Sequence, residues 1–352
     1  MAYRFDAVPK ALVAERRAQF TALGIPARIV DGVAGRLGEE LWDDAPGSWV
    51  SEWSAEAAAA EAGGDLLLAS LCFGAAKYPC LASRAHEIAY GEQLRTYLAA
   101  APAFPLTFER RVLEVAYRGE ATPVPVHVYR RPGGSSAVPV VVMLGGVDTW
   151  KMDIHPWWVG FTQGAALTTL AFDHPGTGET AVPLDEHADD VIRGLADYAR
   201  TLGNGKVAHF GVSFGGNFSA MSGLSGTVDA AVDLGGPVVG AFEVENVQKL
   251  PYGMHDILGN AMHWGHSPTL DELRAGLERL NRQQLLAQRR NSAMLVVNGA
   301  DDYFVPQSDT LVFQGRPKTE VHLVQGTGHC AMSKAPEVVP QIIGWLAAQV
   351  DH

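Results

Sequence analysis

A glycine-flanked serine directly after an apolar run is the feature that most limits what this chain can fold into. Residues 207–210 are Val-Ala-His-Phe, and residues 211–215 are Gly-Val-Ser-Phe-Gly. The run is typical of a buried strand, and the G-x-S-x-G spacing is typical of a sharp turn from a strand into a helix. Such a turn leaves the hydroxyl of Ser213 above the sheet and the amide of Phe214 free to bind an oxyanion. Because glycine and serine are common in loops, the motif is weak by itself, and the rest of the chain has to support it.

Strand and helix patterns alternate along the chain from Phe108 onward. Alternation between strands and helices is typical of a mostly parallel, doubly wound α/β sheet, which is the fold class we expect. The expected strands cover residues 111–117, 124–129, 138–144, 166–172, 207–210, 230–234, 294–297 and 321–324, and the clearest helices cover 187–202 and 338–350.

Two regions lack strand patterns. Before Pro102 and Pro105, helical periodicity is seen over residues 52–62, 66–78 and 85–100, and between Val239 and Asn291 it is seen over 270–288. We therefore expect a helical N-terminal accessory region (1–107), an α/β core (108–238 and 292–352) and a helical lid insertion (239–291). An insertion ahead of the last two strands is expected to lie over the carboxyl ends of the strands.

A serine nucleophile needs a histidine base and an acid that holds the base. His329 ends the sequence Gly-Thr-Gly-His directly after the last expected strand, and residues 298–306, after the preceding strand, contain Asp301 and Asp302. Asp302 has the usual spacing, three residues after Gly299 and four before Pro306. Asp301 and Asp233, which ends an earlier strand, stay open as alternatives. Three loops at three strand ends in the order Ser, Asp, His predict the α/β-hydrolase arrangement.

Two further turns lie near the predicted site. The strand ending at Leu144 is followed by Gly-Gly-Val, so the second oxyanion donor is predicted to be Gly146, with Val147 as the alternative. The turn at residues 172–179 contains His174 and Glu179, for which we expect structural roles rather than contact with substrate. Neither turn has the spacing of a phosphate-binding loop.

The overall composition excludes several classes of partner. A formal net charge of −12 argues against nucleic acid and anionic membrane, and there is no apolar run of membrane-spanning length. Met1 to Arg17 lacks the apolar centre of a signal peptide, and the three cysteines have no metal-ligand spacing. We expect a cytoplasmic protein that acts on a small molecule without metal.

Several segments together carry a family resemblance. They are residues 144–151 (Leu-Gly-Gly-Val-Asp-Thr-Trp-Lys), 164–166, 172–179 and, in the helical region, 73–78 (Phe-Gly-Ala-Ala-Lys-Tyr). With these segments the chain resembles the α/β-hydrolases related to 2,6-dihydroxypseudooxynicotine hydrolase, a group that includes FrsA-like esterases and fungal pigment hydrolases that shorten polyketides. The resemblance implies cleavage of an ester or of a C–C bond beside a carbonyl, no metal or organic cofactor, N-terminal helices that help cover the site, and frequent homodimers. His174 departs from the family pattern, which has a small residue there.

The motifs and the resemblance lead to one expectation. We expect a serine hydrolase acting on an aromatic or polyketide-like carbonyl compound, in which Ser213 attacks, His329 transfers the proton, Asp302 orients His329, and the amides of Phe214 and Gly146 hold the oxyanion. Acyl transfer or cyclisation would use the same residues, and a ligand-binding receptor on this scaffold is the alternative outside enzymes. Four tryptophans, Trp150, Trp157, Trp158 and Trp264, are candidates for an apolar pocket, although tryptophan more often lies in a core.

Overall fold

The computed structural model describes residues 3, 5, 9–42, 45–135 and 137–350, and these contain one eight-stranded sheet. The strand order is β1-β2-β4-β3-β5-β6-β7-β8, with β2 antiparallel to both of its neighbours and the other pairs parallel. The expected mostly parallel sheet is therefore confirmed. The strands are β1 (Thr107–Tyr117), β2 (Glu120–Arg130), β3 (Val140–Leu144), β4 (Thr168–Phe172), β5 (Val207–Val212), β6 (Ala230–Leu234), β7 (Ala293–Gly299) and β8 (Thr319–Val324).

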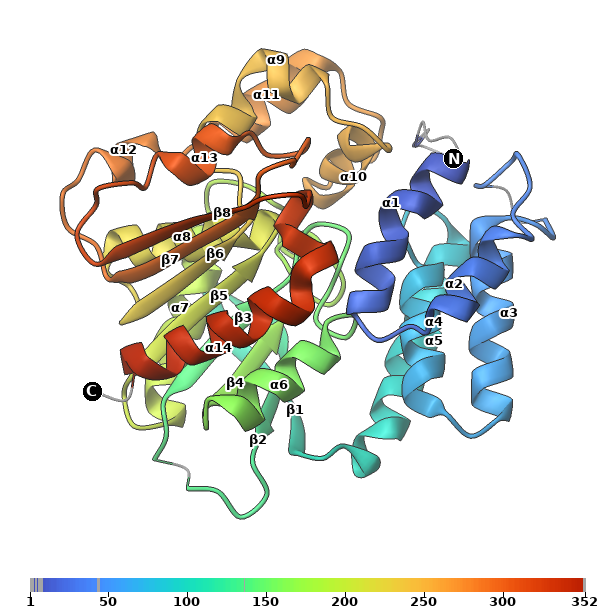
Figure 1. The fold of residues 1–352 in the computed structure, drawn as a ribbon, viewed down its shortest axis with the longest axis horizontal. Coiled ribbons are helices and arrows are strands. Elements are labelled where there is room, and N and C mark those ends of the chain that lie inside the picture. Colours follow the sequence, from blue (N-terminus) through green and yellow to red (C-terminus); the bar gives the residue numbers. More distant parts are fainter. Residues whose placement is uncertain (1–2, 4, 6–8, 43–44, 136, 351–352) are drawn as a thin grey trace.

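Helices cover both faces of the sheet and extend well beyond it (Figure 1). Before the sheet come α1 (Pro9–Ala22), α2 (Ala27–Ala34), α3 (Trp49–Ala62), α4 (Leu66–Ala76), α5 (Arg84–Ala100) and η1 (Ala101–Ala103). Within the sheet unit lie α6 (His155–Gly164), α7 (Ala188–Leu202), α8 (Phe214–Ser225), α13 (Gln307–Leu311), η3 (His329–Lys334) and α14 (Ala335–Val350). Between β6 and β7 lie η2 (Gly240–Phe242), α9 (Val244–Gln248), α10 (Met254–Ala261), α11 (Leu270–Glu278) and α12 (Gln283–Leu286).

The alternation of side chains along each strand divides the interior into two hydrophobic layers. In β3, Val140, Val142 and Leu144 pack in the layer that contains the buried faces of α7 and α8. Val141 and Met143 point the other way, into the layer with α6 and α14, which lie over the front of the sheet in Figure 1. Because both faces are covered, all five residues of β3 are apolar and buried.

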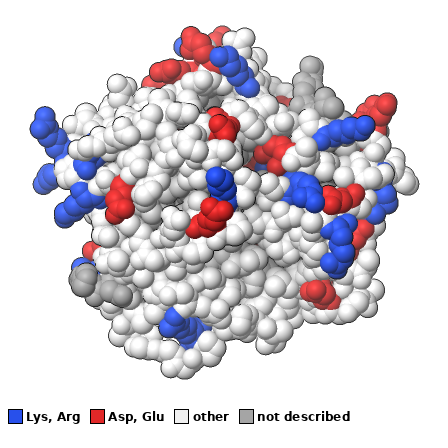
Figure 2. All heavy atoms as spheres, in the orientation of Figure 1, with Lys and Arg blue, Asp and Glu red and all other residues white. Residues whose placement is uncertain are grey.

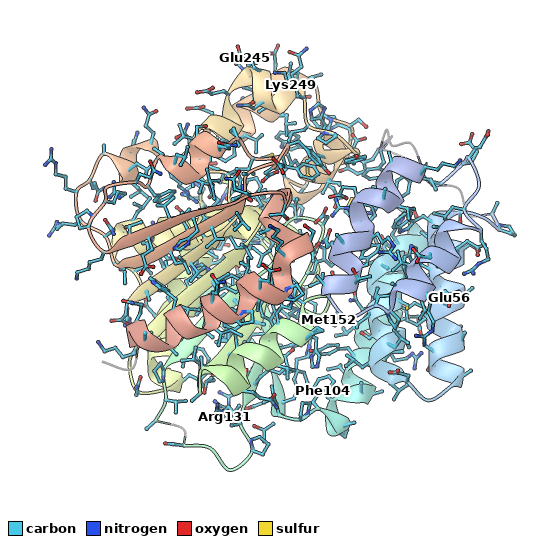
Figure 3. The ribbon with its side chains drawn as sticks, viewed as in Figure 1. Glu56, Phe104, Arg131, Met152, Glu245 and Lys249 are labelled. Atoms are coloured by element: carbon cyan, nitrogen blue, oxygen red, sulfur yellow. The ribbon has the colours of Figure 1, made fainter. Side chains whose placement is uncertain are left out.

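The helices α1–α5 form a separate layer beside the sheet, at the right of Figure 1. They have their own cluster of buried residues, which includes Trp49 and Trp53. A smaller cluster joins this layer to the sheet unit, because Tyr90 of α5 meets Trp150 edge to face with ring centroids 5.1 Å apart. Met152 is buried in the same cluster and lies at the junction in Figure 3.

Buried ion pairs reinforce this junction. Lys77, which follows α4, lies 2.8 Å from a carboxylate oxygen of Asp153 and 3.9 Å from the centre of the Trp150 ring. Lys151 is also buried and pairs with Asp173 and Glu179. A buried charge that loses its partner is strongly destabilising. The Lys77–Asp153 pair therefore stabilises the packing of the helical layer against the sheet unit.

The helices between β6 and β7 lie above the sheet in Figure 1 and are held at both ends. At the first end, Asp309 of α13 accepts backbone N–H groups from Val238 at 2.7 Å and Ala241 at 3.1 Å. At the other end, the buried Arg282 donates two hydrogen bonds of 2.8 Å to Asp189. The helical pattern expected over residues 270–288 is divided between α11 and α12, and Arg282 is buried at the break between them.

Charged side chains of both signs are interspersed on the face shown in Figure 2. Of the helices in the described ranges, none is both long and apolar enough to cross a membrane.

Candidate active site

Ser213 lies in a strained turn between β5 and α8, with φ 56° and ψ −130°. The glycines around it are needed because the turn is crowded. A Cβ on Gly211 would lie 2.0 Å from the carbonyl oxygen of Gly215, and a Cβ on Gly215 would lie 2.4 Å from that of Gly145. A non-glycine residue with positive φ is uncommon and tends to occur where function requires a particular side-chain direction. The local sequence thus forces Ser213 to project from the end of the strand.

The loops after β7 and β8 bring Asp302 and His329 to this serine. His329 Nε2 lies 2.8 Å from Ser213 Oγ, and His329 Nδ1 lies 2.7 Å from Asp302 Oδ2. The Asp302 side chain is completely buried and also accepts hydrogen bonds from the Asn298 amide at 2.8 Å and the Phe304 backbone N–H at 2.8 Å. A carboxylate held in this way favours the histidine form that is protonated on Nδ1 and free to accept the serine proton on Nε2.

The other two candidate acids lie elsewhere. Asp301 is exposed, whereas Asp233 is buried beside the serine turn and accepts the Gly236 backbone N–H at 2.7 Å. Burial raises the pKa of Asp233 to about 7. Among the three aspartates, Asp302 is the one whose carboxylate contacts His329.

The electrostatics of the His329–Asp302 pair favour proton transfer to the histidine. Burial is the largest single influence on His329 and acts against the charged imidazolium, but Asp302 and Cys330 together outweigh it, so the pKa of His329 is raised well above its ordinary value. Burial also acts against the Asp302 carboxylate, but the charge of His329 and the hydrogen bonds to Asp302 hold the pKa of Asp302 below its ordinary value. His329 is therefore a stronger base than a free histidine.

The loop after β3 passes close to the serine. A Cβ on Gly146 would lie 2.9 Å from Ser213 Cβ, 3.0 Å from Ser213 Oγ and 3.7 Å from the Phe214 nitrogen. Only a glycine leaves room there for another atom beside the hydroxyl. Val147 is buried among core residues. The roles of Phe214 and Gly146 as oxyanion donors stay predictions.

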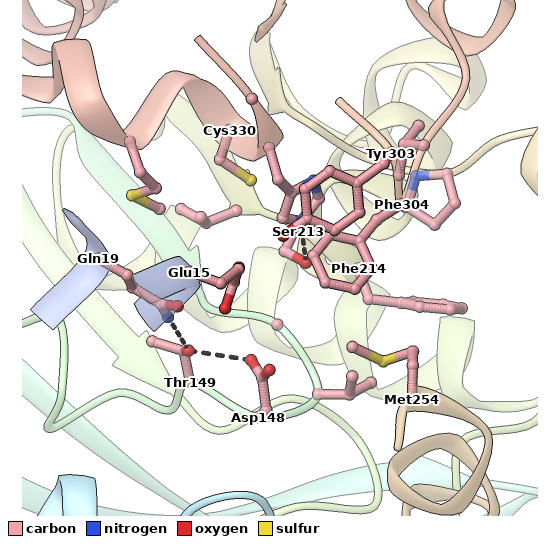
Figure 4. Close-up of a pocket in the computed structure, with 18 of the residues that line it drawn as sticks. Glu15, Gln19, Asp148, Thr149, Ser213, Phe214, Met254, Tyr303, Phe304 and Cys330 are labelled. Carbon is pink, nitrogen blue, oxygen red and sulfur yellow. Dashed lines mark hydrogen bonds between the residues drawn. The ribbon is translucent and has the colours of Figure 1, made fainter. Parts of the chain in front are cut away.

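Ser213 opens into a cavity of about 260 Å³. Figure 4 shows aromatic side chains at one end, including Phe214 and Phe304, and the polar side chains of Glu15 and Asp148 at the other. Helices from both regions without strands contribute to the wall. From α1 come Glu15, Arg16, Ala18 and Gln19, and from residues 239–291 come Ala241, Phe242, Leu250, Met254, Leu258 and Leu277.

Other candidate residues have different places. Of the four tryptophans, Trp157 lines the cavity, Trp150 and Trp158 are buried in hydrophobic clusters, and Trp264 packs at the edge of one.

The two residues of the turn after β4 have different surroundings. His174 is buried against the rings of Phe214 and Phe218, outside the lining of the cavity, and burial lowers its pKa to about 4. Glu179 pairs with Lys151 and Arg110. Both positions agree with the structural roles expected for this turn.

The polar residues of α1 are the part of the cavity that the sequence analysis missed. The sequence pattern indicates them only weakly. Leu12, Arg16 and Phe20 lie on the buried face of α1, and the middle residue of the three is charged rather than apolar. In the described part of the chain, no group of three or more His, Cys, Asp or Glu side chains is placed to hold a metal ion.

Comparison with known proteins identifies the family of the chain. A family model described as "Esterase FrsA-like" matches residues 21–325. Esterase FrsA from Klebsiella pneumoniae is 29% identical over 320 residues, covering 82% of this chain and 74% of the relative, and Esterase FrsA from Salmonella typhi is 27% identical over 319 residues with the same coverage.

Solved structures show the same fold. The 2,6-dihydroxy-pseudo-oxynicotine hydrolase superposes with a TM-score of 0.76 at 20% identity, covering 95% of each chain. Wild-type AbyA5 superposes with a TM-score of 0.76 at 20% identity, covering 96% of this chain and 97% of its own. The protein therefore has the α/β-hydrolase fold, it is a hydrolase, and it belongs to the FrsA-like esterase family.

Proposed function

We propose that this hydrolase is a serine enzyme that cleaves an ester, or a C–C bond next to a carbonyl, in a small molecule with an apolar body. The observation that carries the proposal is the position of His329, within hydrogen-bond distance of both the Ser213 hydroxyl and the Asp302 carboxylate. This is the geometry in which a weak nucleophile can lose its proton as it attacks.

In the proposed reaction, Ser213 Oγ attacks the substrate carbonyl while His329 Nε2 takes the hydroxyl proton. The oxyanion accepts hydrogen bonds from the amides of Phe214 and Gly146, and Asp302 stabilises the imidazolium. His329 then gives the proton to the leaving group, and water, activated by His329, releases the acyl group from Ser213.

The division of the chain into an accessory region (1–107), a core (108–238 and 292–352) and a lid (239–291) is part of this proposal. Residues 1–2, 4, 6–8, 43–44, 136 and 351–352 of these regions lie outside the described residues. Support comes from the cavity, whose wall combines α1 with residues of the 239–291 segment. The apolar character of that segment's contribution supports an aromatic or polyketide-like substrate, because such walls favour apolar groups and exclude water from the oxyanion.

Replacement of the nucleophile tests the proposal. Ser213→Ala should lower the turnover of a p-nitrophenyl ester by about 10³-fold or more while the protein stays folded, and it should abolish labelling by a fluorophosphonate. A mutant that keeps a tenth of the wild-type rate would remove Ser213 from the mechanism. A wild-type protein that turns over no ester and reacts with no fluorophosphonate would favour the receptor alternative.

A further inference from the structure

The end of the cavity formed by α1 and the loop after β3 is polar and closely interconnected. Arg16 Nη2 lies 2.8 Å from Asp148 Oδ2, and Arg16 Nε lies 2.8 Å from Glu15 Oε2. Gln19 accepts a hydrogen bond of 2.6 Å from Arg16 and donates one to Thr149, whose hydroxyl donates to Asp148 Oδ1 at 3.0 Å. Arg16 is 4% exposed, so this network forms part of the buried wall.

The charges in this network do not balance. One guanidinium serves two carboxylates, those of Glu15 and Asp148. Lys77 is the next cation, but its ammonium pairs with Asp153 and reaches Asp148 only at the backbone oxygen, 3.2 Å away. The polar end therefore has one negative charge more than its cations neutralise. Such an excess in a secluded wall favours a ligand that brings a positive charge or a hydrogen-bond donor.

The two carboxylates differ in how well the protein satisfies them. Asp148 accepts the Thr149 hydroxyl and faces the Arg16 guanidinium at its other oxygen. Glu15 Oε2 is buried against Arg16 Nε, 2.8 Å away, but the Glu15 side chain as a whole lines the cavity and is 15% exposed, compared with 8% for the side chain of Asp148. In Figure 4 the Glu15 side chain extends from α1 toward the middle of the cavity, between Ser213 and Asp148. Glu15 is thus the more accessible of the two carboxylates that line this end of the cavity.

We propose that Glu15 determines substrate specificity by accepting a hydrogen bond from a hydroxyl or ammonium group of the substrate. The substrate class is an amphipathic carbonyl compound, with its donor group at Glu15, its carbonyl at Ser213 and its apolar end beneath residues 239–291. This inference rests on the proposed function, because it places the donor group relative to the carbonyl that Ser213 attacks.

Two sets of esters test the inference, one with the donor group on the acyl side of the scissile bond and one with it on the alcohol side. One set comprises the 4-nitrophenyl esters of benzoate, 3-hydroxybenzoate and 3-(aminomethyl)benzoate. The other comprises the butanoate esters of phenol, 3-hydroxyphenol and 3-(aminomethyl)phenol. In wild-type protein, a donor-bearing member of one set should exceed its parent in kcat/KM. Glu15→Leu should lower kcat/KM for that member by about 10- to 100-fold, the usual size of a hydrogen bond to a charged group, and should leave the parent ester within about threefold.

A conservative variant separates the two kinds of donor. Glu15→Gln keeps an acceptor oxygen and the shape of the side chain but removes the charge. A hydroxyl ligand should retain most of its advantage in Glu15→Gln, whereas an ammonium ligand should lose about tenfold. Met254→Leu, at the apolar end, is the matched control and should change all members of a set by the same factor.

Binding measurements give a readout that needs no turnover. Calorimetry with acetophenone, 3-hydroxyacetophenone and 3-(aminomethyl)acetophenone should show a donor-dependent gain in affinity that Glu15→Leu removes. If wild-type protein shows no preference for donors in either assay, or if Glu15→Leu weakens all members equally, the inference is overturned. Loss of fluorophosphonate labelling and of all ester turnover in wild-type protein would instead contradict the proposed function.

Discussion

Replacing the Asp302 carboxylate by an amide tests how the candidate site controls its histidine. Asp302 Oδ2 receives two donors, His329 Nδ1 at 2.7 Å and the Asn298 amide at 2.8 Å. In Asp302→Asn, an NH₂ group at this position would face both donors. His329 would have to present an unprotonated Nδ1, so its proton would move to Nε2, where it blocks acceptance of the Ser213 proton.

The alternative orientation of the amide is no better. Turning the side chain over would place the NH₂ group at the position of Oδ1, against the backbone N–H groups of Phe304 at 2.8 Å and Val305 at 3.2 Å. Either orientation loses hydrogen bonds in a fully buried position. The histidine is therefore held in the wrong protonation form in the first case and poorly oriented in the second.

We expect Asp302→Asn to lower kcat by about 10⁴-fold, which corresponds to about 5 kcal/mol of barrier. The assay is steady-state turnover of a p-nitrophenyl ester, with circular dichroism to verify folding. Asp301→Asn is the adjacent control and should lower kcat by less than about tenfold, because Asp301 is exposed. An Asp302→Asn variant that keeps more than a tenth of the wild-type rate would refute the role of Asp302 in controlling His329. A larger loss in Asp301→Asn or Asp233→Asn would transfer the role of the acid to that residue.

Three further predictions concern the charge pairs. Protonated His329 cannot accept the Ser213 proton, and Asp302 raises the pKa of His329. The value of kcat/KM should therefore rise with pH through a midpoint above about 6.5. A midpoint below about 6 in the pH–rate profile would contradict this pairing. The same raised pKa means that the stability gained from protonating His329 is present below about pH 6.5 and is lost as pH rises through the folded-state pKa, which urea unfolding at several pH values measures. Lys77→Met leaves the Asp153 carboxylate buried without its cation and should lower the free energy of unfolding by about 3–5 kcal/mol. Arg17→Gln, which breaks an exposed pair with Asp31, should change the free energy of unfolding far less. Equal effects of the two substitutions in urea titrations would refute the dependence on burial.

The strands of the sheet could be predicted from sequence because burial on both faces produces continuous apolar runs. The run at residues 230–234 coincides with β6. Errors elsewhere have local causes. The strand expected from Val138 begins at Val140, since Pro139 has no N–H to donate to the ladder. The strand expected from Ala166 begins at Thr168, because Ala166 has φ 53° and cannot continue an extended chain.

The candidate site was predictable only where local patterns constrain it. Glycine spacing and strand ends indicated Ser213, Asp302 and His329, and the structure places these three side chains in contact. The polar side chains that α1 contributes to the cavity were not predictable, because Arg16 is buried by a partner, Asp148, that is distant in sequence. From sequence alone an arginine is expected to be exposed, and its burial can be predicted only if the carboxylate that pairs with it is known.

The position of α1 couples the docking of this helix on the rest of the protein to ligand binding in the cavity. The helix is held by the Arg16–Asp148 ion pair, by the Gln19–Thr149 hydrogen bond and by the Trp157 indole, which donates to the Ala22 carbonyl at 3.2 Å. Because the helix is also a wall of the cavity, a ligand that fills the cavity binds only the docked form and stabilises docking by mass action, by about 2.7 kcal/mol at a hundred times its Kd. Because the two equilibria are linked, a substitution that weakens the docking of α1 also weakens ligand binding, even if the substituted residue does not contact the ligand. Protease cleavage within α1 should therefore slow as the cavity fills.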